Sequence, residues 1–316
     1  MEQLTDERLI APVEAWLRLL RIPNLLTVPG DPIAGYLLAL VCSSTAFSLL
    51  ALTATVAAAL CLYSFGLILN DLVDLKVDLR ERPERPLPSG QITVSTARGV
   101  AVALAFTGLN LALFAGVRVL CAAAVLSALI VLYNAGLKRL PVVGAATMGL
   151  CRGSGFLLGA LAALATPEDL FSVVSTPVLL GFAAVALSFF GVSVVARDEM
   201  EQEKPFGPQR WLPFMALLLT LPAMVVALSA MELIGQMAAM AYVFLMVMTL
   251  MRAWLLGGLM YRAQSVPLTV GGHIRNHLMT QAALCAATGG VGLAAAGVLV
   301  LASQLFGALA RRFYSS

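Results

Sequence analysis

The sequence predicts an all-α, polytopic membrane protein in which nine transmembrane helices form one domain, residues 1–316. Of the 316 residues, 60 % are hydrophobic and 12 % are charged, whereas about 25 % of the residues of a soluble domain are charged. The mean hydropathy is +0.92. Apolar segments long enough to cross a hydrocarbon core of about 30 Å alternate with polar breaks. A soluble globular protein is excluded, and no basic run with interleaved aromatic residues indicates nucleic acid as a partner.

Each predicted span takes its ends from the polar residues, prolines and glycines that interrupt the apolar segments. Residues 1–22 form an amphipathic cytoplasmic segment suited to the membrane surface. The spans follow near residues 24–43, 47–69, 92–115, 117–135, 141–164, 174–196, 211–231, 236–260 and 281–308. Within the first, Asp31 lies beside Pro29, Gly30 and Pro32, which predicts a helix broken at a cavity.

The connections between spans indicate which side of the membrane carries the function. Spans 1 and 2 are joined by little more than residues 43–46, whereas the connections after spans 2, 6 and 8 are long and charged. Sixteen of the twenty Lys and Arg residues lie on the side of the N-terminus and these connections, and the positive-inside rule places that side in the cytoplasm. Arg311 and Arg312, after the ninth span, count against this orientation. We expect an integral protein of a bacterial-type inner membrane, surrounded by membrane lipids, with a cytoplasmic active site.

The strongest chemical signal is the stretch NDLVDLKVDLRERPERPLPSG at residues 70–90, directly after the second span. Asn70, Asp74 and Asp78 recur every four residues, so they line one face of a helix over two turns, and Asp71 borders that face. The stripe is about 12 Å long. Its oxygen ligands suit Mg²⁺, which binds a few carboxylates together with phosphate oxygens and water.

Basic residues follow this stripe. Arg82 and Arg85 lie in a loop punctuated by prolines, and arginine suits bidentate phosphate contacts. Carboxylates for Mg²⁺ beside arginines for phosphate indicate a diphosphate site. The alternative is a solvated charged loop with internal salt bridges, which does not require a four-residue repeat that begins with Asn.

A second acidic cluster follows the sixth span. Asp198 and Glu201 lie one helical turn apart, next to Arg197. Two carboxylate-bearing helix ends on one side of the membrane can face each other across a cavity and share bridging cations.

The stretch at residues 70–90 resembles the first aspartate-rich motif of the UbiA superfamily of intramembrane prenyltransferases, with its Asn-Asp, two further Asp, Arg-Pro twice and Ser-Gly in register. The stretch YNAGLKR at residues 133–139 and the nine spans extend the resemblance over nearly the whole chain. The resemblance implies a bundle around a central cavity open to the cytoplasmic side. There a polyprenyl diphosphate would ionise, and an aromatic carbon or a hydroxyl group of a small acceptor would attack the allylic carbocation.

The resemblance also implies roles for individual residues. The implied Mg²⁺ ligands are Asn70, Asp71, Asp74, Asp78, Asp198 and Glu201. Asp74, Asp78 and Asp198 would be catalytic, and the residues that would bind the diphosphate substrate are Arg82, Arg85, Tyr133, Lys138 and Arg197.

Polar residues inside apolar segments are further candidates. Arg152 lies within a span, so it is expected to bind the diphosphate substrate or to pair with a carbonyl or carboxylate group. Asn24 and Asp31 would contact the acceptor or cap the broken helix. His273 and His277 could share a helix face, but no third metal ligand is near them. A cytoplasmic lid helix between spans 8 and 9 is therefore favoured over a metal site.

The second acidic motif departs from the family pattern, because Pro205 stands where the family has its last Asp and cannot ligate a metal through a side chain. The stretches at residues 148–159 and 193–203 are similar to the divergent EboC-like branch. The favoured function is Mg²⁺-dependent prenyl transfer. The alternative is a non-catalytic UbiA-like protein that binds or transports a lipid-linked or secondary metabolite.

Overall fold

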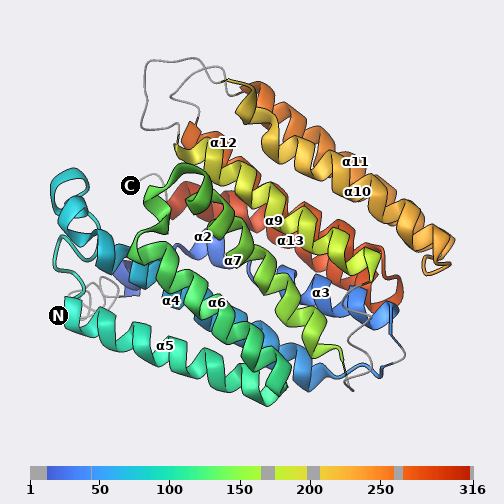
Figure 1. Ribbon diagram of the computed structural model, residues 1–316. Helices are drawn as coiled ribbons and strands as arrows, with labels where there is room; N and C mark the ends of the chain where they lie inside the picture. The colour runs from blue at the N-terminus through green and yellow to red at the C-terminus, as the bar shows by residue number, and fades with distance from the viewer. Residues whose placement is uncertain (1–12, 44, 165–174, 198–206, 260–265, 314–316) are drawn as a thin grey trace, which may run out of the picture.

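The computed structural model describes residues 13–43, 45–164, 175–197, 207–259 and 266–313, and these residues form helices joined by turns and loops. Figure 1 shows an elongated bundle of long helices lying side by side. From residue 22 onward the α-helices are, in chain order, the short α2 (Ile22–Leu25) and then α3 (Gly30–Val41), α4 (Leu49–Glu81), α5 (Val94–Ala115), α6 (Val117–Ala135), α7 (Pro141–Ala162), α9 (Thr176–Arg197), α10 (Leu212–Ala230), α11 (Gln236–Leu259), α12 (Val266–Ala286) and α13 (Gly290–Phe313). Within the described ranges, nine helical segments are long and apolar enough to cross a membrane, as predicted.

Local sequence signals set several helix ends. The side chain of Ser48 accepts a hydrogen bond from the Ala51 backbone N–H at the start of α4, and Thr93 does the same for Thr96 at the start of α5. Gly116, with a φ of 139°, joins α5 to α6 without any other linking residue. A backbone angle in this region favours glycine, because an L side chain would be strained there. The predicted span at residues 117–135 therefore coincides with α6.

The first span is broken as predicted. The short helix α2 ends at Leu25, and α3 starts at Gly30. Beyond the break α3 packs closely on α7: a Cβ atom at Gly35 would overlap the Phe156 carbonyl oxygen, and one at Gly159 would overlap the Pro32 carbonyl oxygen. Small residues of this kind let two membrane helices approach at backbone distance. This contact fixes the break, and with it Asp31, against α7.

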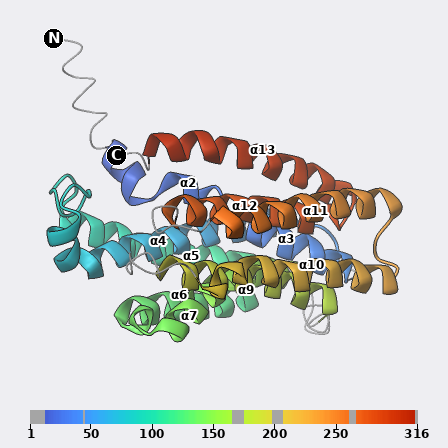
Figure 2. The same cartoon turned by 90° about the horizontal axis from the view of Figure 1, so that it is seen from above.

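The predicted lid helix is wrong. Residues 266–286 form α12, which packs against α11, α13, α3 and α9 inside the bundle, and Figure 2 shows it between α13 and α10. From residue 276 to residue 286 its side chains are buried whether apolar, as for Leu278, or polar, as for His277 and Gln281. The polar residues lowered the hydropathy of this segment and suggested a surface position, but inside the bundle they bind one another and their neighbours.

The position of α12 changes the C-terminal topology. The predicted ninth span, residues 281–308, is divided by a turn in which Gly289 and Gly290 have φ angles of 66° and 42°. This turn lines a small cavity together with the end of the α10–α11 connection and the first residues of α11. The chain has therefore crossed the bundle along α12 before it reaches this turn. The helix α13 returns along α12 and contacts α2 (Figure 1). Arg311 and Arg312 thus lie toward the end of the bundle that carries the charged connections, which removes the objection they raised.

Candidate active site

A cavity of about 460 Å³ lies inside the bundle and opens near the end of α4 that carries the acidic stripe. Its walls come from the region of α2 and α3 and from α4, α6, α7, α9 and α12. Apolar residues such as Val28, Ala59 and Leu126 line much of it, while polar residues line its inner end, through Asp31 and Arg152, and its mouth. The polar lining residues there are Arg21, Asn24, Asn70, Tyr133, Asn134 and Arg197. An apolar cavity with a few convergent polar groups is the usual form of a small-molecule site.

The acidic stripe lies on the helix that the spacing predicts. The helix α4 continues twelve residues beyond the predicted end of the second span, to Glu81, and so carries all four residues of the stripe. Asp71 and Asp78 are buried. A second apolar cluster, which includes Leu19 from residues 13–19 and Leu87 from the loop after α4, packs against this end of α4 and holds the stripe in place.

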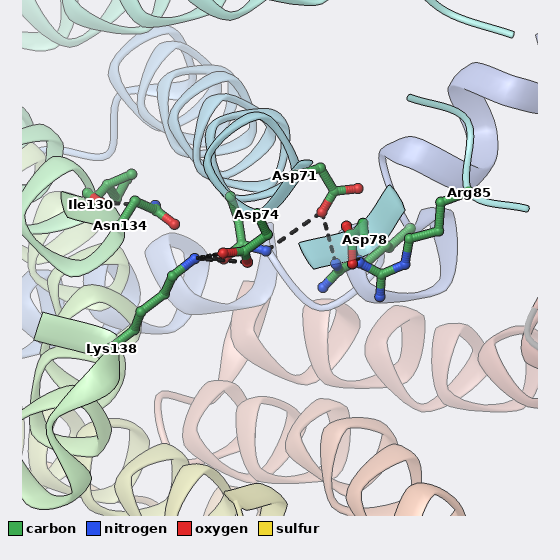
Figure 3. Close-up of polar contacts among 9 residues, drawn as sticks. Asp71, Asp74, Asp78, Arg85, Ile130, Asn134 and Lys138 are labelled. Carbon is green, nitrogen blue, oxygen red and sulfur yellow. Dashed lines mark hydrogen bonds and ion pairs between the residues drawn. The ribbon is translucent and has the colours of Figure 1, made fainter. Parts of the chain in front are cut away.

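The ammonium group of Lys138 marks the point where oxygen atoms of the stripe converge. Lys138 Nζ lies 2.6 and 2.7 Å from the two carboxylate oxygens of Asp74 and 3.1 Å from Asn70 Oδ1. Lys138 lies in a 3₁₀ turn, Leu137–Arg139, between α6 and α7. Figure 3 shows its side chain reaching Asp74 from beside Asn134. A cation therefore already occupies a point that is surrounded by the oxygens of the motif.

The other two aspartates of the stripe also have basic partners. Arg21 Nη2 lies 3.1 Å from Asp71 Oδ1, and Arg85 Nη1 lies 2.8 Å from Asp78 Oδ2 (Figure 3). The solvated-loop alternative expected salt bridges within the loop, and the Asp78–Arg85 contact is of that kind. The pairs of Asp71 and Asp74 instead reach other parts of the chain, and the two residues Arg21 and Asn70 also line the cavity.

The donor set fits a hard divalent cation. Asn70 and Asp74 offer oxygen atoms that converge on one point, and oxygen is what Mg²⁺ prefers. No group of three His, Cys, Asp or Glu residues that could hold a metal is present in the described ranges, so these residues supply only part of a coordination shell. The predicted ligands Asp198 and Glu201 lie outside the described residues, as does Pro205.

The predicted substrate-binding residues are distributed unevenly. Asn24, Tyr133, Arg152 and Arg197 line the cavity, and Arg197 Nη2 also donates a hydrogen bond to the Arg139 carbonyl oxygen. Lys138 and Arg85 bind the stripe from outside the lining. Arg82 is exposed just after α4 and does not line the cavity.

Arg152 pairs with a carboxylate and a carbonyl group, which is one of the two roles expected from the sequence. Its Nη2 lies 3.0 Å from Asp31 Oδ2 and donates to the backbone and hydroxyl oxygens of Thr27. The guanidinium group also lies 4.5 Å from the centre of the Phe189 ring and 5.5 Å from that of Tyr63. Because these contacts hold the side chain from several directions, Arg152 is a fixed part of the inner wall.

Asp31 is the centre of this buried network. Its Oδ1 lies 2.6 Å from His277 Nε2 and accepts a hydrogen bond of 2.7 Å from Gln281 Nε2. The side chain of Asp31 binds the side chains of Arg152, His277 and Gln281, so it acts as the acceptor of this network rather than as a helix cap. The network joins α3, α7 and α12, and its members Asp31 and Arg152 line the cavity together with the rings of Tyr63 and Phe189.

Sequence reasoning missed several of these residues. Arg21 was counted only as a positive charge, and Asn134 only as part of a resembling stretch. Gln281 was not singled out, and His277 was considered as a metal ligand rather than as a partner of Asp31. One signal was available: two opposite charges within apolar spans, Asp31 and Arg152, are expected to pair with each other.

Comparison with known proteins decides the family. The model of the UbiA prenyltransferase family matches residues 32–269, which is most of the chain and includes the whole acidic stripe. The chain belongs to the UbiA prenyltransferase family. It is therefore an integral, multi-pass membrane protein.

Individual UbiA relatives refine this result. The chain is 31 % identical over 174 residues to the digeranylgeranylglyceryl phosphate synthase of Methanoculleus marisnigri, an alignment that covers 55 % of this chain and 60 % of the relative. The matched part thus spans less than two thirds of that relative's length. Such relatives do not support the EboC-like branch.

Solved structures of UbiA homologues share the fold. The homologue from Aeropyrum pernix K1 superposes with a TM-score of 0.63 at 20 % identity, covering 82 % of this chain and 96 % of that chain. A homologue from Archaeoglobus fulgidus bound to DMAPP and Mg²⁺ superposes with a TM-score of 0.55 at 17 % identity, covering 84 % and 98 %.

Proposed function

We propose that this UbiA protein transfers a prenyl group from a polyprenyl diphosphate to a small acceptor, with Mg²⁺ as cofactor. The observation that carries the proposal is the convergence of Asn70 and Asp74 oxygens on one cationic point near the mouth of an apolar cavity. Family membership supports the same reaction, and a distant homologue was solved with Mg²⁺ and a prenyl diphosphate.

The proposed site has two parts, one for the diphosphate group of the substrate and one for its prenyl chain. The diphosphate lies beside the stripe, where Lys138, Arg85, Arg21 and Arg197 supply positive charge, and the prenyl chain enters the apolar cavity. Mg²⁺ held by Asn70 and Asp74, with Asp71 and Asp78 beside them, supplies Lewis-acid stabilisation of the leaving diphosphate. The apolar walls exclude water from the allylic cation.

The bond changes are those of an alkyl transfer. The allylic C–O bond breaks and its electron pair leaves with the diphosphate. A lone pair of the acceptor oxygen then forms the new C–O bond, and the hydroxyl proton passes to the departing diphosphate. Basic residues around the stripe stabilise the charge that develops there.

A hydroxyl acceptor is favoured over the expected aromatic one. The name of the synthase relatives describes a product in which two geranylgeranyl groups are attached to glyceryl phosphate, and glyceryl phosphate has no aromatic ring. We therefore propose a prenyl ether of glyceryl phosphate as the acceptor class for this chain. A cytoplasmic position of the site is part of the same proposal, and the positive-inside count supports it.

The experiment is a transfer assay with purified protein and Mg²⁺. Labelled geranyl, farnesyl and geranylgeranyl diphosphates are each combined with a geranylgeranyl ether of glyceryl phosphate or with a panel of aromatic acceptors. We expect an ether product with the glyceryl phosphate acceptor. Aromatic products alone would overturn the acceptor assignment, and binding of the diphosphate without any product would favour the non-catalytic alternative.

A further inference from the structure

A divalent cation that binds the stripe would compete with Lys138 for the same oxygen atoms. The ammonium group lies within 3.1 Å of three oxygens of Asn70 and Asp74, which are the oxygens that a divalent cation would need. Two cations cannot share that point, because at about 4 Å their repulsion is already substantial when the surroundings are less polar than water. Lys138 must therefore leave these oxygens when a metal binds there.

The remaining aspartates of the stripe do not offer the metal a carboxylate without a basic partner. Asp71 is paired with Arg21 and Asp78 with Arg85, so each carboxylate of the stripe already has a basic partner. A divalent cation that binds alone would displace positive groups and leave them without an anion nearby. A diphosphate that arrives with the metal would supply the missing negative charge.

Asn134 provides a place for the displaced ammonium group. It lies four residues before Lys138, close to the turn that carries the lysine, and the residue is only 4 % exposed although it lines the cavity. Its Nδ2 donates to the Ile130 carbonyl oxygen, which fixes the amide orientation, and its Oδ1 has no partner among the described residues. Figure 3 shows Asn134 on the same side of Asp74 as Lys138. A buried carbonyl oxygen without a donor is costly, and an ammonium group has three hydrogens to share.

We propose that Lys138 is an exchange group and Asn134 a positioning residue for it. In this inference, which rests on the proposed function, Lys138 leaves the Asn70 and Asp74 oxygens as a divalent cation binds, and it then bridges Asn134 Oδ1 and the diphosphate. Metal and diphosphate consequently bind cooperatively, and each raises the affinity of the other by the same factor.

The test measures metal binding without catalysis. Isothermal titration of the full chain in detergent micelles with Mg²⁺ is carried out alone and with saturating inorganic pyrophosphate. For the native protein we expect pyrophosphate to raise Mg²⁺ affinity by about 5- to 150-fold, the usual range of coupling between two ligands. In Lys138→Met, Mg²⁺ alone should bind at least about fivefold more tightly, and the coupling factor should fall toward one.

Two further variants separate positioning from structure. Asn134→Leu should reduce the coupling factor, and Asn134→Asp, which keeps an oxygen acceptor, should retain most of it. A purely structural role for Asn134 would not follow this pattern. The matched control is Lys76→Met, because Lys76 is an exposed lysine on α4, the helix that carries the stripe, and this variant should leave both affinities unchanged.

The outcomes distinguish this inference from the proposed function. If Mg²⁺ binds the native protein equally well with and without pyrophosphate, or if Lys138→Met is folded and binds Mg²⁺ as the native protein does, the exchange is refuted even when prenyl transfer is observed. Cooperative binding that depends on Lys138 and Asn134 supports the exchange even when no acceptor yields product, and that combination counts against the proposed transfer alone.

Discussion

Replacement of Arg152 by Leu should be among the most destabilising single changes in the bundle. The side chains of Arg152 and Asp31 are 6 % and 3 % exposed, and the ion pair measures 3.0 Å. Removing one partner of a buried pair costs about 3–5 kcal/mol, since the other charge stays buried without compensation. His277 and Gln281 still donate to Asp31 in this variant, so we expect the free energy of unfolding to fall by an amount near the lower limit, about 3 kcal/mol.

The Asp31→Leu variant and the double variant complete a double-mutant cycle. Asp31→Leu leaves the guanidinium group and the His277 ring without their acceptor, and it should also cost about 3–5 kcal/mol. In the double variant neither charge is buried, and the main remaining defect is the orphaned ring nitrogen of His277. That defect costs about 1–3 kcal/mol, so the coupling between the two positions should be at least about 3 kcal/mol.

The assay is equilibrium unfolding of each variant in mixed micelles, followed by circular dichroism. Arg152→Lys serves as a control that keeps the charge but loses the planar fork of donors, and it should fall between the native protein and Arg152→Leu. The reasoning is refuted if Arg152→Leu costs less than about 1 kcal/mol, or if the double variant loses the sum of the two single losses.

Three further predictions concern packing, diphosphate binding and the metal. Gly159→Ala should lower the free energy of unfolding by about 1–3 kcal/mol in the same assay, because the new methyl group meets the Pro32 backbone. The control is Gly99→Ala, where a Cβ meets nothing within 4 Å. Equal losses in the two variants would contradict the packing argument. Arg85→Met should raise the KM for the prenyl diphosphate about tenfold or more in steady-state kinetics, since a charge-assisted hydrogen bond contributes about 1.5–3 kcal/mol. A change confined to the KM of the acceptor would contradict a role of Arg85 in binding the diphosphate. Removal of divalent cations with EDTA should abolish transfer and added Mg²⁺ should restore it; transfer that persists in EDTA would eliminate the metal from the account.

Most of the fold follows from local properties of the sequence. The lengths of the apolar segments and their punctuation by Gly and Pro predicted the helices as far as α11 and the break before Asp31. The helix α12 was misplaced because its polar residues resemble those of a surface helix. They are stabilised inside the bundle by contacts such as His277 with Asp31, and these two residues are 246 positions apart. A hydropathy pattern contains no information on such distant pairing.

The candidate site shows the same division between local and distant information. The four-residue repeat of Asn70, Asp74 and Asp78 placed the stripe on a helix face. The partner of Asp74 is 64 residues away, and only the fold shows that Lys138 occupies the convergence point of the oxygens. The unpartnered oxygen of Asn134 depends on a hydrogen bond within α6 that no sequence pattern specifies.

The central claim is that the stripe holds Mg²⁺ for ionisation of a prenyl diphosphate, and Asp74→Asn tests it most directly. The measurement is the rate of product formation from labelled geranylgeranyl diphosphate and a glyceryl phosphate ether by the native protein and by the variant at saturating Mg²⁺. Loss of a metal ligand removes several kcal/mol of charge stabilisation, so the rate should fall at least about 100-fold while the variant stays folded. A folded Asp74→Asn protein that forms product at the native rate would contradict the account.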